Sequence, residues 1–502
     1  MLSFKEQAQR MNIKLVRKLK FSAINNLSLN TIKTEILSGI TVAFALIPES
    51  LAFAAIAQVP PMVALYTSFC IAISISIFGG RPAMISAATG SMSLLMTTLV
   101  TKYGIEYLFA ATILTGIIQF LMGIFQLGRF FTFVPQSVVS GFVNALGILI
   151  FIAQIQQFAG ESLPMYLMVA GTLGIVYLLP RFTKAIPSPL VAIVVMTIIS
   201  ISTHANVRKV GDIGNITSQL PSIHLPQVSF SLETLSIILP YAFTLSIVGL
   251  LESLLTADLL DELTETKSSK NQEVRGQGIA NIITGFFGGM AGCGMVGQSI
   301  INIRSGGRGR LSTFISGAFL LVLIFALKNI VLQVPMAALI GVMIMVAFET
   351  FDWKSLQQIR KMSPGEATIM PLTMGITLLT HDLAKGVLVG VIVSALIFGW
   401  KAAKIKVAKS FDESGSKVYT VSGQLFFAST AHFGDVFNYN EDPEKVIIDF
   451  SFAHIWDYAA VTAVSKVIER YRKLDKDVEV RGLNVESQTH MHRAGIYDSE
   501  LN

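Results

Sequence analysis

Long apolar runs interrupted by short polar breaks occupy most of the chain. Residues 50–80, 107–128, 131–160 and 277–303 contain no Asp, Glu, Lys or Arg. An apolar run of about 20 residues is long enough to cross a bilayer as a helix. Breaks at charges, Gly and Pro divide the region before residue 402 into about fourteen predicted helical segments. These segments lie near residues 35–57, 61–79, 88–101, 106–127, 133–158, 164–180, 186–203, 234–257, 275–290, 295–303, 312–328, 331–348, 366–380 and 384–400.

A different pattern begins after about residue 415. Four predicted strands lie near residues 417–421, 424–428, 444–450 and 478–483. Residues 458–471 fit an amphipathic helix that Asp457 would cap at its N-terminus. This order of strands and helix predicts a small α/β domain. The chain is thus divided into a basic N-terminal segment, a transmembrane domain, a linker and a small soluble domain, over residues 1–34, 35–402, 403–415 and 416–502 respectively.

Composition separates these two parts and excludes several classes of protein. Hydrophobic residues make up 52% of the chain, charged residues make up 14%, and the mean hydropathy is +0.62. Soluble proteins carry about 25% charged residues, so an ordinary soluble enzyme and a disordered chain are both excluded. About 42 charged residues fall in residues 1–400 and about 28 in residues 401–502, which marks the tail as the soluble part.

The sequence shows no set of residues typical of an enzyme or of an ATP-driven pump. It has no Gly-rich phosphate loop ending in Lys-Ser or Lys-Thr, and no nucleophile–base pair is visible. His490 and His492 lack Cys or acidic partners at metal-ligand spacing. Cys70 and Cys293 both lie in apolar segments and give no support for a disulfide. We therefore expect no enzymatic activity, and no cofactor other than a coupling ion.

Lys and Arg are distributed unevenly about the predicted spans. With a cytoplasmic N-terminus and fourteen spans, about 20 of them precede the first span or follow even-numbered spans, and about five follow odd-numbered ones. This bias predicts a multi-pass membrane protein with both termini cytoplasmic. The basic, amphipathic N-terminal segment predicts a helix on the membrane surface rather than a cleaved signal peptide. The net charge of +6 therefore reflects orientation, and no nucleic-acid partner is expected.

Two parts of the transmembrane region repeat each other. Residues 48–54 (Pro-Glu-Ser-Leu-Ala-Phe-Ala) resemble residues 251–257 (Leu-Glu-Ser-Leu-Leu-Thr-Ala), and residues 77–80 resemble residues 286–289, each ending in Phe-Gly-Gly. A small, polar stretch follows each copy. The first three predicted segments thus recur as segments eight to ten, and an offset of seven spans gives the copies opposite topology. Inverted repeats of this kind are typical of secondary transporters.

The third and tenth predicted segments are too short to cross a bilayer alone. Each is predicted to be an extended piece followed by a half-helix, with the two helix N-termini facing each other near the middle of the membrane. Helix N-termini carry unpaired N–H groups and a positive dipole end, which together bind anions. Close helix packing through small residues is the alternative explanation. Hydroxyl, amide and backbone donors would come from Thr89, Gly90, Ser91, Gly297, Gln298 and Ser299.

Glu49 and Glu252 are ionisable residues inside predicted spans, where charges are costly and usually functional. Beside an anion site, a carboxylate repels the substrate unless it is protonated or bound to a cation, which predicts symport with H⁺ or Na⁺. A hydrogen-bonded structural glutamate is the alternative. Thr256 lies one turn beyond Glu252 on the same helix face, where it could share a cation or bond to its own helix.

Four motifs resemble the sulfate permease (SulP) family, the bacterial relatives of solute carrier family 26. They lie at residues 61–68, 78–80 with 90–93, 276–281 with 287–289, and 306–312. The order of elements in the tail resembles a STAS domain, a small α/β fold. The resemblance implies an all-α membrane protein of seven plus seven inverted spans, with two half-helices, a core domain (segments 1–4 and 8–11) and a gate domain (segments 5–7 and 12–14). It also implies a place in the bacterial plasma membrane, elevator-like movement of the core and a homodimer. The substrates that it implies are sulfate, bicarbonate, chloride, oxalate or dicarboxylates.

The resemblance also implies roles for particular residues. The positions that match the family's substrate-binding residues are Phe53, Thr89, Gly90, Ser91, Met295, Val296, Gly297, Gln298 and Ser299. Glu252 matches a position where some bicarbonate carriers have Asp for Na⁺ and others have Glu, thought to serve H⁺; Thr256 and Gly294 could complete a Na⁺ site. Many members have Gln where this chain has Glu49, and vertebrate-type members have Arg where it has Gln298. These departures favour cation coupling, with H⁺ symport preferred and Na⁺ left open.

Other functions stay open at the level of sequence. The same fold could serve an uncoupled anion channel or exchanger, or a nucleobase-type carrier. The alternative from a different class is a membrane sensor or scaffold that acts through its STAS domain, although it would not need paired intramembrane glutamates. In soluble STAS relatives a Ser that follows Asp at the helix start is phosphorylated. Here Tyr458 follows Asp457, so we expect a cytoplasmic interaction or dimerisation module.

Overall fold

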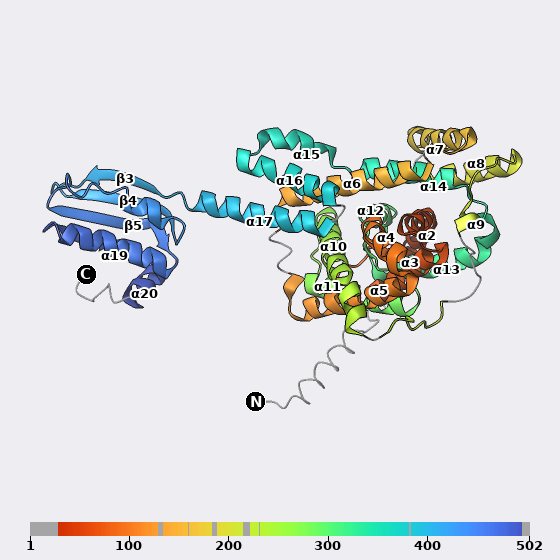
Figure 1. Ribbon diagram of the computed structural model, residues 1–502, viewed down its shortest axis with the longest axis horizontal. Coiled ribbons are helices and arrows are strands. Elements are labelled where there is room, and N and C mark those ends of the chain that lie inside the picture. The colour runs from red at the N-terminus through yellow and green to blue at the C-terminus, as the bar shows by residue number, and fades with distance from the viewer. Residues whose placement is uncertain are drawn as a thin grey trace, which may run out of the picture. The chain divides into compact units, whose positions relative to one another are not determined.

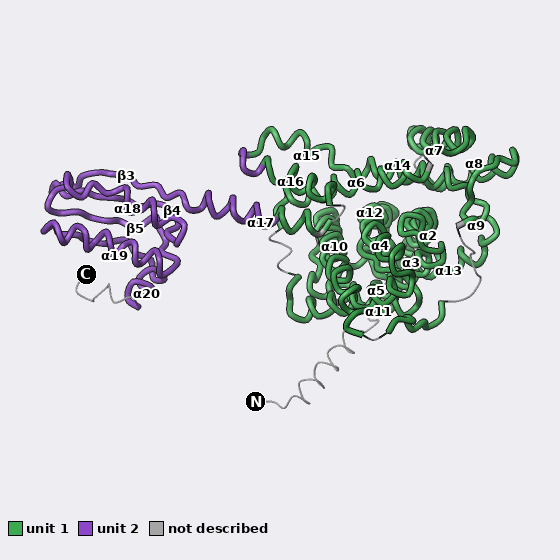
Figure 2. Tube along the Cα trace, in the orientation of Figure 1, with its two compact units in different colours: residues 1–362, 367–390 green, residues 363–366, 391–502 purple. Residues whose placement is uncertain are grey.

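The chain divides into two compact units. The computed structural model describes residues 29–128, 134–158, 160–182, 188–213, 221–229, 231–380 and 383–493. One unit takes in residues up to 362 together with 367–390, and the other takes in residues 363–366 and 391 onward (Figure 2). The helix predicted on the membrane surface falls mostly within residues 1–28, outside the described residues.

Helices make up almost all of the apolar part (Figure 1). They are α2 (Leu29–Ala57), α3 (Pro61–Phe78), α4 (Gly90–Tyr103), α5 (Ile105–Ile124), α6 (Gln136–Phe158), α7 (Leu163–Phe182), α8 (Ser188–Ser202), α9 (Val210–Ile213), α10 (Leu232–Thr264), α11 (Lys270–Phe286), α12 (Val296–Arg304), α13 (Arg310–Val331), α14 (Met336–Thr350), α15 (Trp353–Gln358), the 3₁₀ turn η2 (Ile359–Lys361), α16 (Pro364–Thr380) and α17 (Leu383–Ala402). Every predicted segment coincides with one of them. Within the described residues, nine helices are long and apolar enough to span a membrane, so fourteen spans stays a prediction.

The helices pack as two sets. In the first, α5 packs on α10 and α11, and α13 packs on α2 and α3. In the second, α14 packs on α6, α7 and α8. The sets meet where α2 touches α8 and α14 and where α4 touches α6. This division agrees with the core and gate domains that the sequence resemblance implies, and the first set carries both copies of the repeat.

Two buried carboxylates hold turns of the first set in place. Glu35 of α2, 2% exposed, accepts hydrogen bonds from three backbone N–H groups at the start of α13, those of Arg308 (2.6 Å), Gly309 (2.7 Å) and Ser312 (3.0 Å). Glu273 of α11, fully buried, accepts the N–H groups of the turn after α3 in the same way. Sequence analysis did not single out either residue. Both satisfy N–H groups that have no partner within their own helix or turn.

The second unit contains a four-stranded sheet with the strand order β3-β4-β5-β6. The strands are β3 (Lys406–Phe411), β4 (Lys417–Leu425), β5 (Lys445–Ile455) and β6 (Asp477–Arg481). β3 is antiparallel to β4, whereas β4, β5 and β6 run parallel. The helices α18 (Thr430–Gly434), α19 (Tyr458–Arg472) and α20 (Val485–Arg493) follow β4, β5 and β6 respectively. Buried side chains of α19 and the sheet form one core, and Asp457 caps α19 by accepting the N–H of Ala460 at 2.8 Å, as predicted.

The sheet differs from the prediction in two places. β3 lies inside the predicted linker and was not predicted. It is an edge strand with almost every side chain exposed, so its sequence lacks the alternation of a half-buried strand. The separate strand predicted at 424–428 is wrong. Residues up to Leu425 continue β4 through an irregularity of register between Thr420 and Ser422. Gly423, with a φ of +122°, follows directly, and together the two features interrupt the alternation that marks a strand.

Candidate functional site

Two short extended pieces and the half-helices that follow them form the centre of the site. β1 (Ser86–Ala87) precedes α4, and β2 (Cys293–Gly294) precedes α12. The two pieces pair antiparallel, with Ser86 opposite Gly294 and Ala87 opposite Cys293. The N–H of Met295, the residue before α12, also donates to the carbonyl of Ile85 at 2.8 Å. The predicted arrangement of an extended piece followed by a half-helix is therefore confirmed in both copies.

The pairing of these pieces depends on a glycine and an asparagine. Gly292 lies directly against the backbone of Ala87, where a side chain would not fit. Asn281 of α11 is fully buried; its amide accepts the N–H of Gly292 at 2.9 Å and donates to the carbonyl of the same residue at 3.1 Å. The same Nδ2 donates to Gln119 of α5 at 2.9 Å. The half-helix start is thus anchored on the helices of its own domain.

Each intramembrane glutamate receives a hydrogen bond from the half-helix of the other repeat. Gln298 of α12 donates from Nε2 to Oε1 of Glu49 on α2, at 2.5 Å. Ser91 of α4 donates from Oγ to Oε2 of Glu252 on α10, also at 2.5 Å. Both glutamates are partly exposed, whereas Gln298 is 2% exposed and Ser91 is fully buried. The repeats therefore exchange a donor and a carboxylate, which the sequence analysis did not predict.

Cys293 is a site residue that the sequence analysis missed. Its thiol donates to Oε2 of Glu252 at 2.7 Å and lies 3.2 Å from the hydroxyl of Thr89. That hydroxyl lies 3.1 Å from the hydroxyl of Ser91. The available signal was its position just before the tenth segment, in the small, polar stretch that follows the second copy of the repeat. In the described part of the chain, both carboxylates are thus bonded by neutral groups: an amide, a hydroxyl and a thiol.

The remaining predicted substrate-binding residues surround the two helix starts in different ways. The ring of Phe53, 4% exposed, lies against Gly90, where an added Cβ would be 3.2 Å from the ring edge. At Gly90, therefore, the small residue allows close packing, which is the alternative to a role in anion binding. At the other start, Gly297 has no atom within 4 Å of its Cβ direction and Val296 is 42% exposed. The start of α12 is therefore open on one side, as an anion site requires.

Three of the predicted site residues form hydrogen bonds that support the fold. The hydroxyl of Ser299 accepts the N–H of Ile85 at 2.9 Å, so it supports the extended piece. Thr256 donates to the carbonyl of Glu252 at 2.7 Å, which is the bond to its own helix that the sequence left as one alternative. The N–H of Gly294 donates to Ser253 at 2.9 Å.

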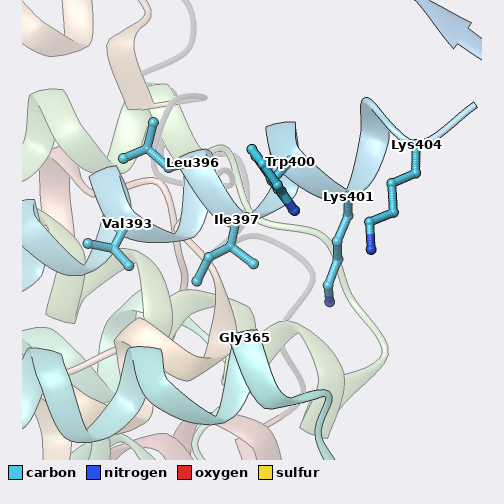
Figure 3. Close-up of a pocket in the computed structure, with 7 residues that line it drawn as sticks. All are labelled: Gly365, Val393, Leu396, Ile397, Trp400, Lys401 and Lys404. Carbon is cyan, nitrogen blue, oxygen red and sulfur yellow. The ribbon is translucent and has the colours of Figure 1, made fainter. Parts of the chain in front are cut away.

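A hollow in the second unit shares no residue with this site. It lies between the start of α16 and the last turns of α17, and is lined by Gly365, Val393, Leu396, Ile397, Trp400, Lys401 and Lys404 (Figure 3). Leu396 is 68% exposed and Trp400 is 73% exposed. Exposed apolar side chains that end in Trp and Lys are typical of a helix leaving the bilayer at its interface.

Comparison with known proteins identifies the family. Residues 32–165 and 162–373 match the Sulfate permease family, and residues 407–501 match the STAS domain. The chain belongs to the sulfate permease family. It is 55% identical over 460 residues to "Putative sulfate transporter YbaR" of Bacillus subtilis (strain 168), covering 92% of this chain and 96% of that protein. It is 30% identical over 520 residues to the bicarbonate transporter BicA of Picosynechococcus, covering 93% and 91% respectively.

Solved structures of sulfate permease relatives share the fold. The transmembrane domain of a cyanobacterial BicA aligns with a TM-score of 0.65 and 28% identity, covering 74% of this chain and 98% of that one. The overall structure of SLC26A9 aligns with a TM-score of 0.82, covering 97% and 91%, and at 17% identity it shows the fold alone. The predicted class, a helical membrane domain with a C-terminal STAS domain, is confirmed. The relatives are named as transporters and not as enzymes, as the sequence predicted.

Proposed function

We propose that this protein is a secondary active transporter that moves a small anion of the sulfate, bicarbonate or dicarboxylate class across the plasma membrane. Symport with H⁺ is the preferred coupling and Na⁺ is the alternative. The names of the relatives, a sulfate transporter and a bicarbonate transporter, support the substrate class. The separation of the helices into two packed sets supports an elevator-type movement of the set that carries the site.

The observation that carries the proposal is the meeting of two half-helix starts at one pair of extended strands. Helix N-termini bind anions through free N–H groups and the positive end of the dipole. Gly297 leaves the start of α12 open, and Ser91 and Gln298 place polar side chains beside the two starts. An anion at this position would need no basic side chain.

Coupling follows from the two carboxylates. An anion about 5 Å from an ionised carboxylate is repelled by about 3 kcal/mol at an effective dielectric constant of 20, equivalent to more than a hundredfold in affinity. A proton or a cation at the carboxylate removes this repulsion. The proton is preferred because Ser91 and Cys293 both direct a hydrogen at Oε2 of Glu252, so a cation at that oxygen would have to displace them.

Uptake of labelled sulfate, bicarbonate and fumarate into proteoliposomes tests the proposal. An inward H⁺ gradient is expected to accelerate uptake by the unmodified protein, and Glu252→Gln is expected to remove this acceleration. Glu262→Gln is the matched control, because it makes the same change at an exposed position of the same helix. Acceleration by a Na⁺ gradient alone would select the Na⁺ alternative. Uptake that responds to neither gradient would refute coupling, and no uptake of any anion would refute transport.

The STAS domain is proposed to act as a cytoplasmic interaction or dimerisation module. It offers exposed aromatic side chains, among them Phe427 (72%), Phe452 (73%) and Tyr458 (76%). The mass of the purified protein in detergent, measured with and without residues 403–502, would show whether this domain is needed for the proposed homodimer. An unchanged dimer after truncation would assign dimerisation to the membrane part.

A further inference from the structure

The amide of Gln298 has one hydrogen-bonded end and one unpaired end. Its nitrogen donates to Glu49 at 2.5 Å, whereas its oxygen Oε1 is buried and has no donor among the described residues. A buried acceptor without a donor is unfavourable, because it has lost water without gaining a replacement. The arrangement therefore satisfies an ionised Glu49 at the expense of the amide oxygen.

Protonation of Glu49 would reverse this arrangement. A carboxyl group carries an O–H donor that an ionised carboxylate lacks, and the amide oxygen is the acceptor without a partner. With the proton on Glu49, the amide can turn so that the carboxyl O–H donates to Oε1. The amide NH₂ is then released from Glu49, and both of its hydrogens become available as donors.

The position of Gln298 makes this reversal relevant to an anion. It is the third residue of α12, so its side chain leaves the helix within the turn whose free N–H groups would bind the substrate. An unpaired amide oxygen repels an anion, whereas an unpaired NH₂ attracts one. Glu349 of α14 is the other titratable residue whose charge acts on Glu49 in the described part of the chain, and no basic group acts on it there.

We propose that Gln298 is a proton-operated switch that presents its amide oxygen when Glu49 is ionised and its amide NH₂ to the anion when Glu49 is protonated. The inference rests on the proposed H⁺ symport and adds the step by which the proton raises anion affinity. Gln298 serves as a specificity-determining residue in this step, because a residue with a fixed positive charge at this position would bind the anion at every pH.

The first experiment measures the KM for labelled sulfate in proteoliposomes as a function of pH, because sulfate keeps its charge between neutral and mildly acidic pH. In the unmodified protein, KM is expected to fall as the pH is lowered, and the switch is expected to contribute about tenfold to this fall, the size of one hydrogen bond to a charged group. Gln298→Met retains the length of the side chain and removes both amide atoms. It is expected to raise KM at low pH and to reduce the pH dependence by about tenfold, leaving the part that comes from direct repulsion by the carboxylates.

Ser299→Ala is the matched control on the next residue of the same helix. It removes a hydroxyl that accepts a backbone N–H and does not bond to a carboxylate. Its KM is expected to change by a similar factor at every pH. If the KM of Gln298→Met depended on pH as strongly as that of the unmodified protein, the switch would be overturned, even with H⁺-driven uptake intact. If the unmodified protein showed no H⁺-driven uptake, the proposed coupling itself would be refuted.

A second measurement tests the switch without transport. Infrared difference spectra between acidic and neutral pH, recorded on the protein in lipid, are expected to contain a carboxyl C=O band that Glu49→Gln lacks. In Gln298→Met this band is expected to move to higher frequency, because the carboxyl O–H has lost its acceptor, and in Ser299→Ala it should stay in place. A band at the same frequency in Gln298→Met, or no band that depends on Glu49, would overturn the inference.

Discussion

Replacement of Gly292 by alanine is expected to displace the start of α12. The added Cβ would lie 2.6 Å from Cδ1 of Ile71 and closer still to the carbonyl oxygen of Ala87, whereas such contacts are essentially never below 3.0 Å. The neighbour is backbone of the paired strand, so the strain cannot be relieved by a side-chain rotation. β1 and β2 must separate, which also weakens the bonds from Asn281 to Gly292.

The expected size of this effect is about 3 kcal/mol. Overpacking of a well-packed interior costs about 1–3 kcal/mol, and a weakened buried hydrogen bond adds about 1 kcal/mol. Because the displaced strand carries the residues before α12, transport should fall together with stability. Thermal unfolding in detergent and initial uptake rates in proteoliposomes measure the two effects. We expect a clearly lower midpoint and at least a tenfold loss of uptake.

Gly174→Ala is the control for a glycine-to-alanine change in a helix of the same protein. Gly174 lies inside α7 and has no atom within 4 Å of its Cβ direction. Alanine favours a helix over glycine by about 1 kcal/mol, so stability should be unchanged or slightly higher. If Gly292→Ala retained the unfolding midpoint and uptake rate of Gly174→Ala, the close approach of β1 and β2 would not be what positions the half-helix.

Three further predictions concern buried polar groups. Asn281→Ala should lower the unfolding midpoint by an amount equivalent to about 2–4 kcal/mol, because it leaves both backbone polar groups of Gly292 unpaired; an unchanged midpoint would contradict this. Asp442→Ala should destabilise the STAS domain by about 3 kcal/mol in denaturant titrations, since two buried tyrosine hydroxyls donate to its Oδ2 at 2.6 and 2.5 Å. Burial would raise the pKa of Asp449, but hydrogen bonds from Ser451 and an arginine outweigh it and hold the pKa below its ordinary value. The stability from this carboxylate is therefore present above its unfolded pKa and is lost as the pH falls through the lowered pKa, and Asp449→Asn should remove this acid-dependent loss from unfolding curves recorded across that range.

The amino-acid sequence determined the helices and the repeat. Apolar runs of about 20 residues are long enough to cross a bilayer as helices, which satisfy every backbone polar group within the segment. The position of each predicted segment therefore followed from local composition. The short third and tenth segments, and the shared Glu-Ser-Leu motif, were also visible as local features. In the STAS domain, by contrast, the exposed strand β3 and the irregular part of β4 near Gly423 escaped the pattern, because the alternation that marks a strand was absent or interrupted.

Tertiary structure decided which groups meet at the site. Gln298 bonds to Glu49 and Ser91 bonds to Glu252, although each pair is separated by well over a hundred residues. The exchange between repeats arises because β1 and β2 pair antiparallel, and no local signal states that pairing. The contact of Cys293 with Glu252 has the same origin. The sequence determined that two half-helices and two glutamates exist. The pairing of β1 with β2, which places each half-helix beside the glutamate of the other repeat, determined which donor each carboxylate receives.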